Sequence, residues 1–207
     1  MVFTDVASEV ESASQKMIDR APTLHDVLCS TFAPLIQSCE GATYLCLYSW
    51  NLASSVISGF TAAGGVCSQM LVWDKHRRSP GRCNYQQQYE PILYGCPQGR
   101  KPYWRGGRNQ GDVWSVPSSH GTKPVDLIER AVSHSSKTGD VVLDPFAGSG
   151  TTLIACQRLG RKACLLETDP RYIDQICLRW QQFTGEPAIL GTQNLSFAKV
   201  QQARQNA

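Results

Sequence analysis

The chain has 207 residues, of which 42% are hydrophobic and 18% charged, with only 17 glycines and 11 prolines. This composition is typical of one globular domain with a substantial core, and it excludes disordered, collagen-like and fibrous proteins. The formal net charge of +3 is too small to identify a partner, but segment 74–114 carries eight basic residues against three acidic ones, which predicts a surface that binds a polyanion.

The N-terminal third predicts helices and strands in alternation. We expect a polar helix over residues 8–20, a second helix from Thr23 that Pro34 bends or shortens, a strand over 43–48 and a helix over 49–63. A strand followed by a helix indicates an α/β arrangement.

The middle of the chain predicts a hairpin and a long loop. Two β-prone runs, 70–73 and 91–94, lie on either side of a basic loop that contains Gly and Pro, so we expect them to pair. Residues 95–121 follow with little hydrophobic periodicity and many Gly, Arg and Trp. Because a structureless loop of this length is uncommon in a compact domain, we expect it to be functional.

The C-terminal half predicts a βαβ unit. A helix opened by Thr122 and Pro124 and ended by Gly139 comes first. The unit itself is a strand at 141–143, a tight turn at 148–150, a helix at 151–159 and a strand at 163–166. A helix capped by Asp169 and Pro170 follows and ends at Gly185. Trp180 and Phe183 are expected in the core, and the polar tail 201–207 is expected to fray.

The turn of this βαβ unit has the features of a nucleotide site. Gly148 and Gly150 let the backbone pass close to a ligand, and the helix that follows offers unpaired N–H groups. Glu167 ends the next strand about twenty residues on, where a carboxylate in such a unit accepts hydrogen bonds from ribose hydroxyls. These features predict a nucleoside cofactor; the alternative is that the glycines only let the helix pack on the sheet.

The full sequence of the turn narrows the class of cofactor. Residues 144–152, Asp-Pro-Phe-Ala-Gly-Ser-Gly-Thr-Thr, resemble the cofactor loop of S-adenosylmethionine-dependent DNA amino-methyltransferases. Further similar segments are 73–75, 89–95, 103–104, 120–125 and 167–185, so the resemblance covers roughly residues 1–188. The motif order is that of the permuted group, in which the catalytic strand precedes the cofactor strand.

This resemblance implies an α/β, Rossmann-like methyltransferase fold with a mostly parallel central sheet. It divides the methyltransferase domain 1–188 into a catalytic-strand half (1–73), a basic and aromatic DNA-recognition insertion (74–121) and a cofactor-binding half (122–188), followed by a tail (189–207). It implies S-adenosylmethionine as the cofactor, bound by Lys123, Asp144, Phe146, Gly148, Gly150, Thr151 and Glu167. The alternative for Lys123 is a solvated lysine in a first helical turn.

The resemblance also implies a catalytic acceptor. An exocyclic amino nitrogen is a poor nucleophile, so the base must be flipped out and its amino group held by acceptors that face the methyl donor. The family does this with Asp-Pro-Pro-Tyr, whereas here Asp5 follows Val2-Phe3-Thr4 and precedes Val6-Ala7-Ser8. Asp5 is the expected catalytic residue, and a surface aspartate at a frayed terminus is the alternative. Because the chain begins inside this strand, we expect the strand and helix that usually precede it to be missing.

The basic segment provides the expected DNA contacts. Lys75, Arg77, Arg78, Arg105 and Arg108 are expected to bind phosphates of double-stranded DNA. Tyr103, Trp104 and Trp114 are expected to stack on displaced bases. The alternative is a merely solvated loop.

Other classes of site receive less support. Nine cysteines form no Cys-x-x-Cys pair, and the four histidines have no ligand-like spacing to them, so reduced thiols and no metal site are predicted. No stretch approaches the ~20 apolar residues of a membrane span and no signal peptide is visible, so we expect a cytoplasmic protein without a membrane partner.

The predicted function is therefore methyl transfer from S-adenosylmethionine to an exocyclic amino group in DNA, as in restriction-modification systems, with adenine N6 favoured over cytosine N4. One alternative is a catalytically inactive, cofactor- or DNA-binding remnant of the family, which the loss of Pro-Pro-Tyr favours. Another is an NAD-dependent oxidoreductase, but the turn lacks the three-glycine spacing of that class.

Overall fold

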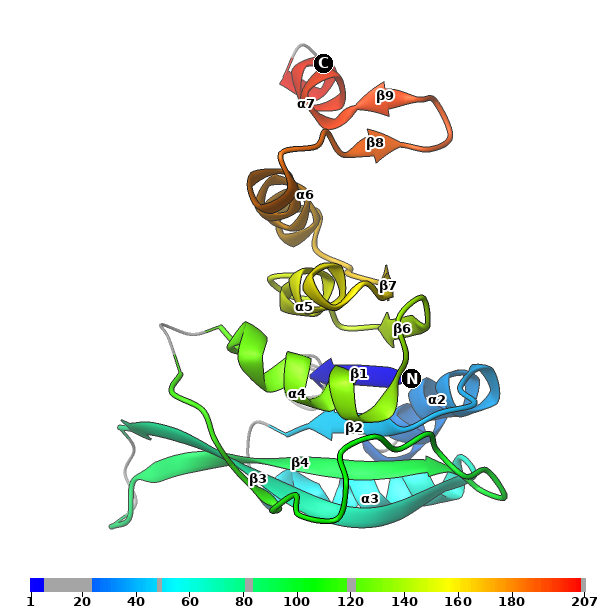
Figure 1. Ribbon diagram of the computed structural model, residues 1–207, viewed down its shortest axis with the longest axis vertical. Coiled ribbons are helices and arrows are strands. Elements are labelled where there is room, and N and C mark those ends of the chain that lie inside the picture. The colour runs from blue at the N-terminus through cyan, green and yellow to red at the C-terminus, as the bar shows by residue number, and fades with distance from the viewer. Residues whose placement is uncertain (6–23, 48–49, 81–83, 119–121, 206–207) are drawn as a thin grey trace, which may run out of the picture.

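The centre of the molecule is a seven-stranded sheet in the order β5-β3-β4-β2-β1-β6-β7 (Figure 1). The computed structural model describes residues 1–5, 24–47, 50–80, 84–118 and 122–205. The strands are β1 (Val2–Asp5), β2 (Thr43–Cys46), β3 (Gly65–Ser79), β4 (Gln87–Pro97), β5 (Val113–Ser115), β6 (Val141–Asp144) and β7 (Lys162–Leu165). All neighbouring pairs are parallel except β2–β4 and β3–β4. This mostly parallel sheet confirms the predicted α/β, Rossmann-like fold class.

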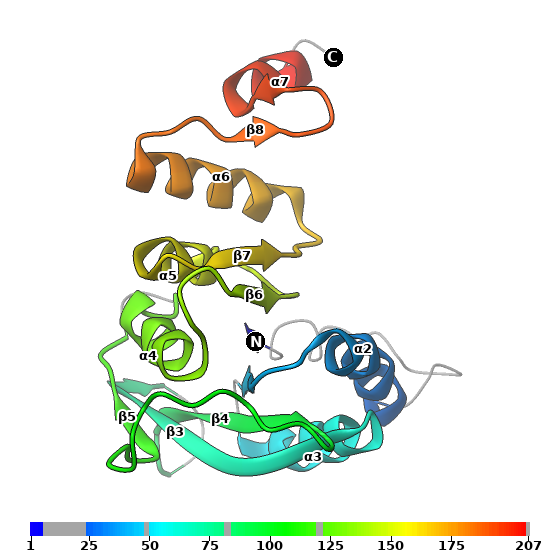
Figure 2. The same ribbon diagram turned by 45° about the vertical axis from the view of Figure 1, so that its right-hand side comes forward.

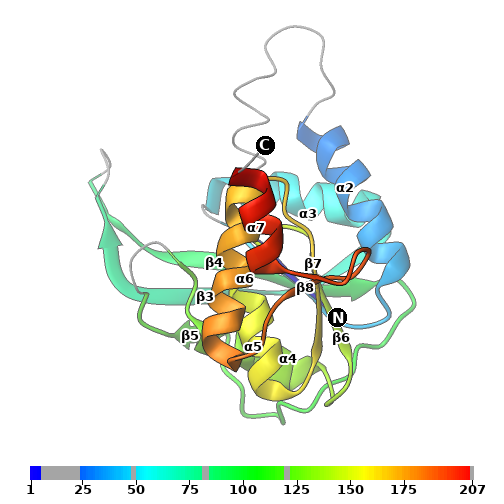
Figure 3. The same cartoon turned by 90° about the horizontal axis from the view of Figure 1, so that it is seen from above.

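Helices cover both faces of the sheet (Figure 3). One face packs on α2 (Leu24–Ser38) and α3 (Ala53–Ala62), and the other packs on α4 (Val125–Ser135) and α5 (Thr151–Leu159). Leu28, Phe32 and Phe60 anchor the first core. Leu127 and Ile128 anchor the second. Two separate apolar cores, one on each face, hold the parallel strands between them, as expected for strands buried on both sides.

The hairpin prediction is confirmed, although both strands are longer than the apolar runs that indicated them. The antiparallel pairing of β3 with β4 extends from Gly65 opposite Pro97 to Ser79 opposite Gln87, with irregularities in register. Residues 76–79 of β3 and 87–89 of β4 are mostly polar and exposed, whereas the other end of β4, residues 95–97, is buried. A ribbon of two long strands reaches beyond the sheet (Figure 1).

The expectation of a structureless loop over residues 95–121 is wrong in part. Val113–Ser115 forms β5, which pairs in parallel with the centre of β3 and buries Trp114. A strand of three residues is too short to show an alternating pattern, which is why the sequence concealed it.

Three helix predictions need correction at their ends, and a fourth helix cannot be compared. Helix α2 runs through Pro34 to Ser38 and is not shortened there. A 3-10 turn over Trp50–Leu52 precedes α3, so the α-helix begins only at Ala53. Helix α4 ends at Ser135 because Ser136 is extended, and Gly139 lies in the turn that follows. The helix expected over 8–20 lies outside the described residues.

The C-terminal part is more ordered than predicted. After α6 (Pro170–Thr184), the strands β8 (Ile189–Leu190) and β9 (Leu195–Ser196) form a small two-stranded sheet. Helix α7 (Phe197–Gln205) follows and includes most of the tail that was expected to fray. Figure 2 shows α6, β8 and α7 as successive layers beyond β7.

Helix α6 is covered on little of its surface. Ile176 is its one buried residue, while Phe183 is 43% exposed beneath the guanidinium of Arg158, so the expectation that Phe183 lies in the core is wrong. Trp180 is partly buried and its indole N–H donates to Gln157. Within the described residues, no helix combines the length and apolar character needed to cross a membrane.

Candidate active site

The site lies where the connections of the parallel sheet diverge. From β1 the chain passes to β2 through α2 on one face, and from β6 it passes to β7 through α5 on the other face. Such a switch point leaves a crevice at the carboxyl ends of the two central strands. A cavity of about 610 Å³ occupies this place, and its lining includes Asp5 at the end of β1 and Asp144 at the end of β6.

The two glycines of the turn have different tasks. Gly148 has φ +49° and lines the cavity, and a Cβ atom there would meet no atom within 4 Å, so it faces open space. Gly150 has φ +72° and is the N-cap residue directly before α5, and a Cβ atom there would lie 2.8 Å from Ile176 Cγ1. Gly148 therefore leaves room for a ligand, whereas Gly150 lets α6 approach the turn and does not line the cavity.

Glu167 is held by backbone groups on one wall of the cavity. Its Oε2 accepts the Gly148 N–H at 2.8 Å, and its Oε1 accepts the N–H groups of Thr168 and Asp169 at 2.8 and 3.0 Å. Each carboxylate oxygen has more than one acceptor position. The carboxylate is thus fixed in place and retains capacity to accept hydrogen bonds from a ligand's hydroxyl groups.

Asp144 connects the elements that form the floor. Its Oδ1 accepts from the hydroxyl of Thr4 on β1 at 2.9 Å and from the Phe146 N–H at 3.2 Å, and its Oδ2 accepts from the hydroxyl of Thr152 on α5 at 2.6 Å. Burial raises the pKa of Asp144, and these hydrogen bonds oppose the shift. Asp144 thus shapes the cavity by holding β1, the turn and α5 together.

Two further predicted residues also line this cavity. Phe146 offers a partly buried aromatic surface. Thr151 is buried at the start of α5, where its hydroxyl accepts from Arg179 Nη1 at 3.0 Å. This hydrogen bond anchors α6 to the turn. Thr151 therefore contributes to the cavity wall mainly through its position.

A second cavity of about 350 Å³ adjoins the first. Both are lined by Asp5, Thr122 and Lys123, so these residues stand between them. The second cavity is also lined by Trp73, whose indole N–H donates to the Val116 carbonyl at 2.7 Å. The occupants of the two cavities would therefore be separated by Asp5, Thr122 and Lys123.

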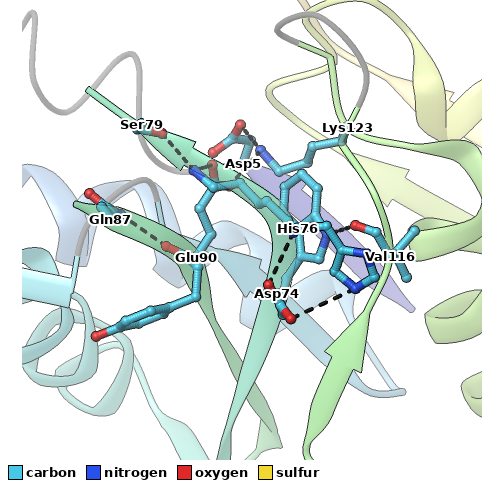
Figure 4. A network of polar contacts seen from close by, with 11 residues as sticks. Asp5, Asp74, His76, Ser79, Gln87, Glu90, Val116 and Lys123 are labelled. Atoms are coloured by element: carbon cyan, nitrogen blue, oxygen red, sulfur yellow. Dashed lines mark hydrogen bonds and ion pairs between the residues drawn. The ribbon is translucent and has the colours of Figure 1, made fainter. Parts of the chain in front are cut away.

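Charged side chains form a chain of contacts at this boundary (Figure 4). Lys123 forms an ion pair and hydrogen bond with Asp5 Oδ2, and its Nζ also lies 3.9 Å from Glu90 Oε2. Glu90 Oε1 accepts from Lys75 Nζ at 3.3 Å, and Lys75 donates in turn to the Ser79 hydroxyl at 3.3 Å. We call Asp5, Lys123, Glu90 and Lys75 the charge cluster.

Burial and mutual attraction oppose each other in the charge cluster. Burial raises the pKa of Glu90, and the ammonium groups of Lys123 and Lys75 limit the rise. Burial lowers the pKa of Lys123, but Asp5, Cys46 and Glu90 raise it by more, so the net shift is upward. Burial also raises the pKa of the Cys46 thiol, which lies at the end of β2 between the strands that carry Asp5 and Glu90. Because the pKa of Lys123 is raised, this side chain stays protonated.

The predicted DNA-binding residues do not form one surface. Lys75 is largely buried and its ammonium pairs with Glu90 in the charge cluster, although the residue also lines the second cavity. Arg77 and Arg78 are exposed and line the second cavity. Arg105 is anchored at the opposite end of α4, where its N–H donates to the His134 carbonyl. An eleven-residue helix spans about 16 Å, and that length separates Arg105 from the start of α4 beside Lys123.

The predicted stacking aromatics are also distributed. Trp114 is buried in the core, so it is not available to a displaced base. Tyr103 and Trp104 are 38% and 44% exposed, and Trp104 packs against Tyr94 and His134 at ring-centroid distances of 6.3 and 5.3 Å. Exposed Arg108 lies in the same loop. This aromatic group is thus at the far end of α4 from Asp5.

Glu90 is a site residue that the sequence analysis did not select. The segment around it was noted for its resemblance, yet only its position in the folded sheet brings it to Lys123. A carboxylate directly before a run of buried apolar residues, Pro91 to Leu93, was the available signal, since such a charge is rarely buried unless paired.

A family model described as a DNA methylase matches residues 60–177, which is more than half of the chain. Among curated proteins, type II methyltransferase M2.DpnII of Streptococcus pneumoniae is 31% identical over 125 residues, covering 50% of this chain and 47% of that protein. M.BglII of Bacillus subtilis is 34% identical over 109 residues, covering 48% and 28%. The chain thus spans about a quarter to a half of the length of the curated relatives it matches.

Solved structures share the fold. The M1.HpyAVI–SAM complex superposes with a TM-score of 0.65 at 23% identity, covering 86% of each chain. The PvuII DNA methyltransferase, described as cytosine-N4-specific, gives a TM-score of 0.67 at 12% identity, covering 86% of this chain and 78% of that one.

Proposed function

Since the chain belongs to the DNA methylase family whose model matches residues 60–177, we propose that it transfers a methyl group from S-adenosylmethionine to an exocyclic amino group of a base in double-stranded DNA. The observation that carries the proposal is the meeting of two cavities at Asp5. A methyl donor in one and an extruded base in the other would face each other across a carboxylate, which is the arrangement that amino-group methylation requires.

The larger cavity fits the cofactor by its size and chemistry. Its volume lies within the range of small-molecule sites. Gly148 faces open space, Glu167 presents fixed acceptors for ribose hydroxyls, and Phe146 offers an apolar surface. When bound, the cofactor supplies an electrophilic methyl group on a sulfonium. Asp144 and Gly150 would act indirectly, by holding the turn and α6 in place.

Asp5 would receive the target amino group. Its carboxylate lines both cavities and can accept a hydrogen bond from the amino group. This hydrogen bond increases the electron density on the nitrogen as the methyl group approaches. Arg77 and Arg78, at the rim of the smaller cavity, would hold the phosphates beside the extruded base. We favour adenine N6 as the acceptor over cytosine N4.

Methyl transfer would be slow in this chain. Asp5 supplies one acceptor for an amino group with two hydrogens, and no Pro-Pro-Tyr follows it to add a carbonyl acceptor and a stacking ring. A catalytically inactive remnant of the family is the second candidate, because this same departure from the family motif favours it.

The test measures incorporation of a labelled methyl group into mixed-sequence duplex DNA, with chromatography of the digested nucleosides to identify the methylated base. We expect slow incorporation by the wild type and none by Asp5→Ala. Calorimetric binding of the cofactor without incorporation above the Asp5→Ala background would favour the remnant. Incorporation that Asp5→Ala leaves unchanged would place the catalytic site elsewhere.

A further inference from the structure

The charge cluster contains one ammonium group that two carboxylates share. Lys123 Nζ is bonded to Asp5 and lies 3.9 Å from Glu90 Oε2. Asp5 ends β1, whereas Glu90 lies on β4, two strands away across β2. Because β4 is antiparallel to β2, a residue near the start of β4 reaches the same edge of the sheet as the end of β1. The sheet topology therefore brings the two carboxylates to opposite sides of one lysine.

The cluster balances its charges formally, with two carboxylates and two ammonium groups. Glu90 and Lys75 are each 8% exposed, and the Lys123 side chain is 16% exposed. Leaving a buried ammonium without a partner is costly, because its desolvation is no longer compensated. Lys123 can move away from Asp5 only if another carboxylate receives it.

This requirement bears on the proposed reaction. While Lys123 donates to Asp5, it competes for the carboxylate with the amino group of a target base. The second carboxylate of the cluster stands beside the lysine at a distance that a small side-chain movement closes. Its other oxygen is fixed by Lys75, which also donates to Ser79, so Glu90 is held in place for this contact.

We propose that Glu90 is a positioning residue of the methyl-transfer site, which takes the Lys123 ammonium when Asp5 turns to the target amino group. This inference rests on the proposed function. It assigns Lys75 to the support of Glu90 and makes Lys123 the group that responds to occupation of the smaller cavity. Glu90 lines the smaller cavity, and under the proposal it acts on the reaction through Lys123.

The decisive variant is Glu90→Gln with Lys75→Gln, because it removes one carboxylate and one ammonium and leaves Asp5 paired with Lys123. The cluster stays electrically balanced, and the two amides can hydrogen-bond to each other. If Glu90 served only to balance charge, this variant would transfer methyl groups like the wild type. Under the proposal, Lys123 has no second carboxylate, so single-turnover methyl transfer falls at least about 10-fold while cofactor affinity stays within about twofold.

The matched control is Glu129→Gln with Arg158→Gln, which removes an ion pair of 3.4 Å that lies outside both cavities. We expect both double variants to keep the wild-type cofactor affinity, and only the first to lose transfer. Glu90→Asp provides a second measurement if the first variant does not fold. It keeps the charge but withdraws the carboxylate by one methylene, and we expect a rate between those of the wild type and the double variant.

The outcomes are distinguishable. Wild-type transfer that the folded Glu90→Gln/Lys75→Gln variant retains in full would overturn the role of Glu90 alone. A parallel loss of cofactor affinity and rate would also overturn it, because a general distortion of the site would then suffice. Since Glu90 and Lys75 line the smaller cavity, a loss of transfer that saturating DNA restores would overturn it too, because the two residues would then only shape the base pocket. A wild type that binds cofactor and never exceeds the Asp5→Ala background would overturn the proposed function and this inference with it.

Discussion

At the scale of single residues, Gly148 is the position where the cavity depends on the absence of a side chain. A Cβ atom there would contact nothing in the protein, so a larger residue would project into the space assigned to the cofactor. We expect Gly148→Val to abolish cofactor binding, with an added cost from placing a β-branched residue at φ +49°.

Calorimetry with S-adenosylmethionine or its demethylated product measures this loss. Gly191 is a suitable control for a glycine substitution, because it lies between β8 and β9 and a Cβ atom there also meets nothing within 4 Å. Gly191→Val should bind like the wild type. Unchanged affinity in Gly148→Val would show that the ligand does not approach this turn.

The residues after Asp5 lead to a second prediction at this scale. Replacing Val6-Ala7-Ser8 with Pro-Pro-Tyr would restore the family's carbonyl acceptor and stacking ring after the carboxylate. Since misplacement by about 1 Å can cost about 100-fold in rate, we expect a rise of at least about 10-fold in methyl incorporation. Asp5→Ala in the repaired chain should remove the gain, and a repaired chain no faster than the wild type would contradict the assignment of this strand.

The sequence indicated the cofactor side of the site better than its target side. The turn at Gly148 and the carboxylate of Glu167 belong to one βαβ unit, so their local spacing determines where they meet. Glu90 and Lys123 meet only because β4 is antiparallel to β2, and this pairing spans residues far apart in the chain. Likewise, no local pattern reveals that Lys75 pairs with Glu90 and is buried, so the sequence predicts it as a surface cation.

At the scale of secondary-structure elements, the packing of α6 on the turn depends on Gly150. Its φ of +72° and the 2.8 Å separation of a Cβ atom from Ile176 mean that Gly150→Ala introduces backbone strain and a collision. The left-handed conformation alone costs roughly 1–2 kcal/mol for a non-glycine residue. We expect Gly150→Ala to lower the free energy of unfolding by at least about 1 kcal/mol.

A double-mutant cycle with Ile176→Ala separates the two causes. Removing the isoleucine relieves the collision but not the strain, so the double variant should be more stable than additivity predicts, by about 0.5 kcal/mol or more. Chemical denaturation measures all four free energies. Strict additivity would show that Gly150 does not set the approach of α6.

The same element scale explains which secondary structure was predictable. Helices α5 and α6 have a glycine after their last residue and α6 has an Asp-Pro start, so local signals mark their ends. Strand β5 has three residues and takes its stability from pairing with β3. Helix α7 is polar and lacks a marked apolar face, so only its contacts with β8 and β9 distinguish it from a fraying tail.

At the scale of the whole molecule, the fold divides the basic segment between two ends of α4. Arg77 and Arg78 lie at the cavity beside Asp5, whereas Arg105 is anchored about one helix length away, with Arg108 in the same loop. A sequence-based count of charge treats all of them as one surface. The structure instead places the first pair at the smaller cavity, where we propose that the base binds, and the second pair at a distance from it.

Salt dependence of DNA affinity tests this division. Each phosphate contact contributes about −0.9 to the slope of log affinity against log salt for duplex DNA, so the wild type should bind less tightly as salt rises. Arg77→Ala with Arg78→Ala should flatten the slope by about 2 and weaken binding to all sequences. Arg105→Ala with Arg108→Ala has the same change in charge and should flatten it less. Fluorescence anisotropy at several salt concentrations measures the slope and the affinity of both double variants. Equal losses of affinity for the two pairs would show that DNA contacts both ends of α4. An affinity independent of salt would refute phosphate binding altogether.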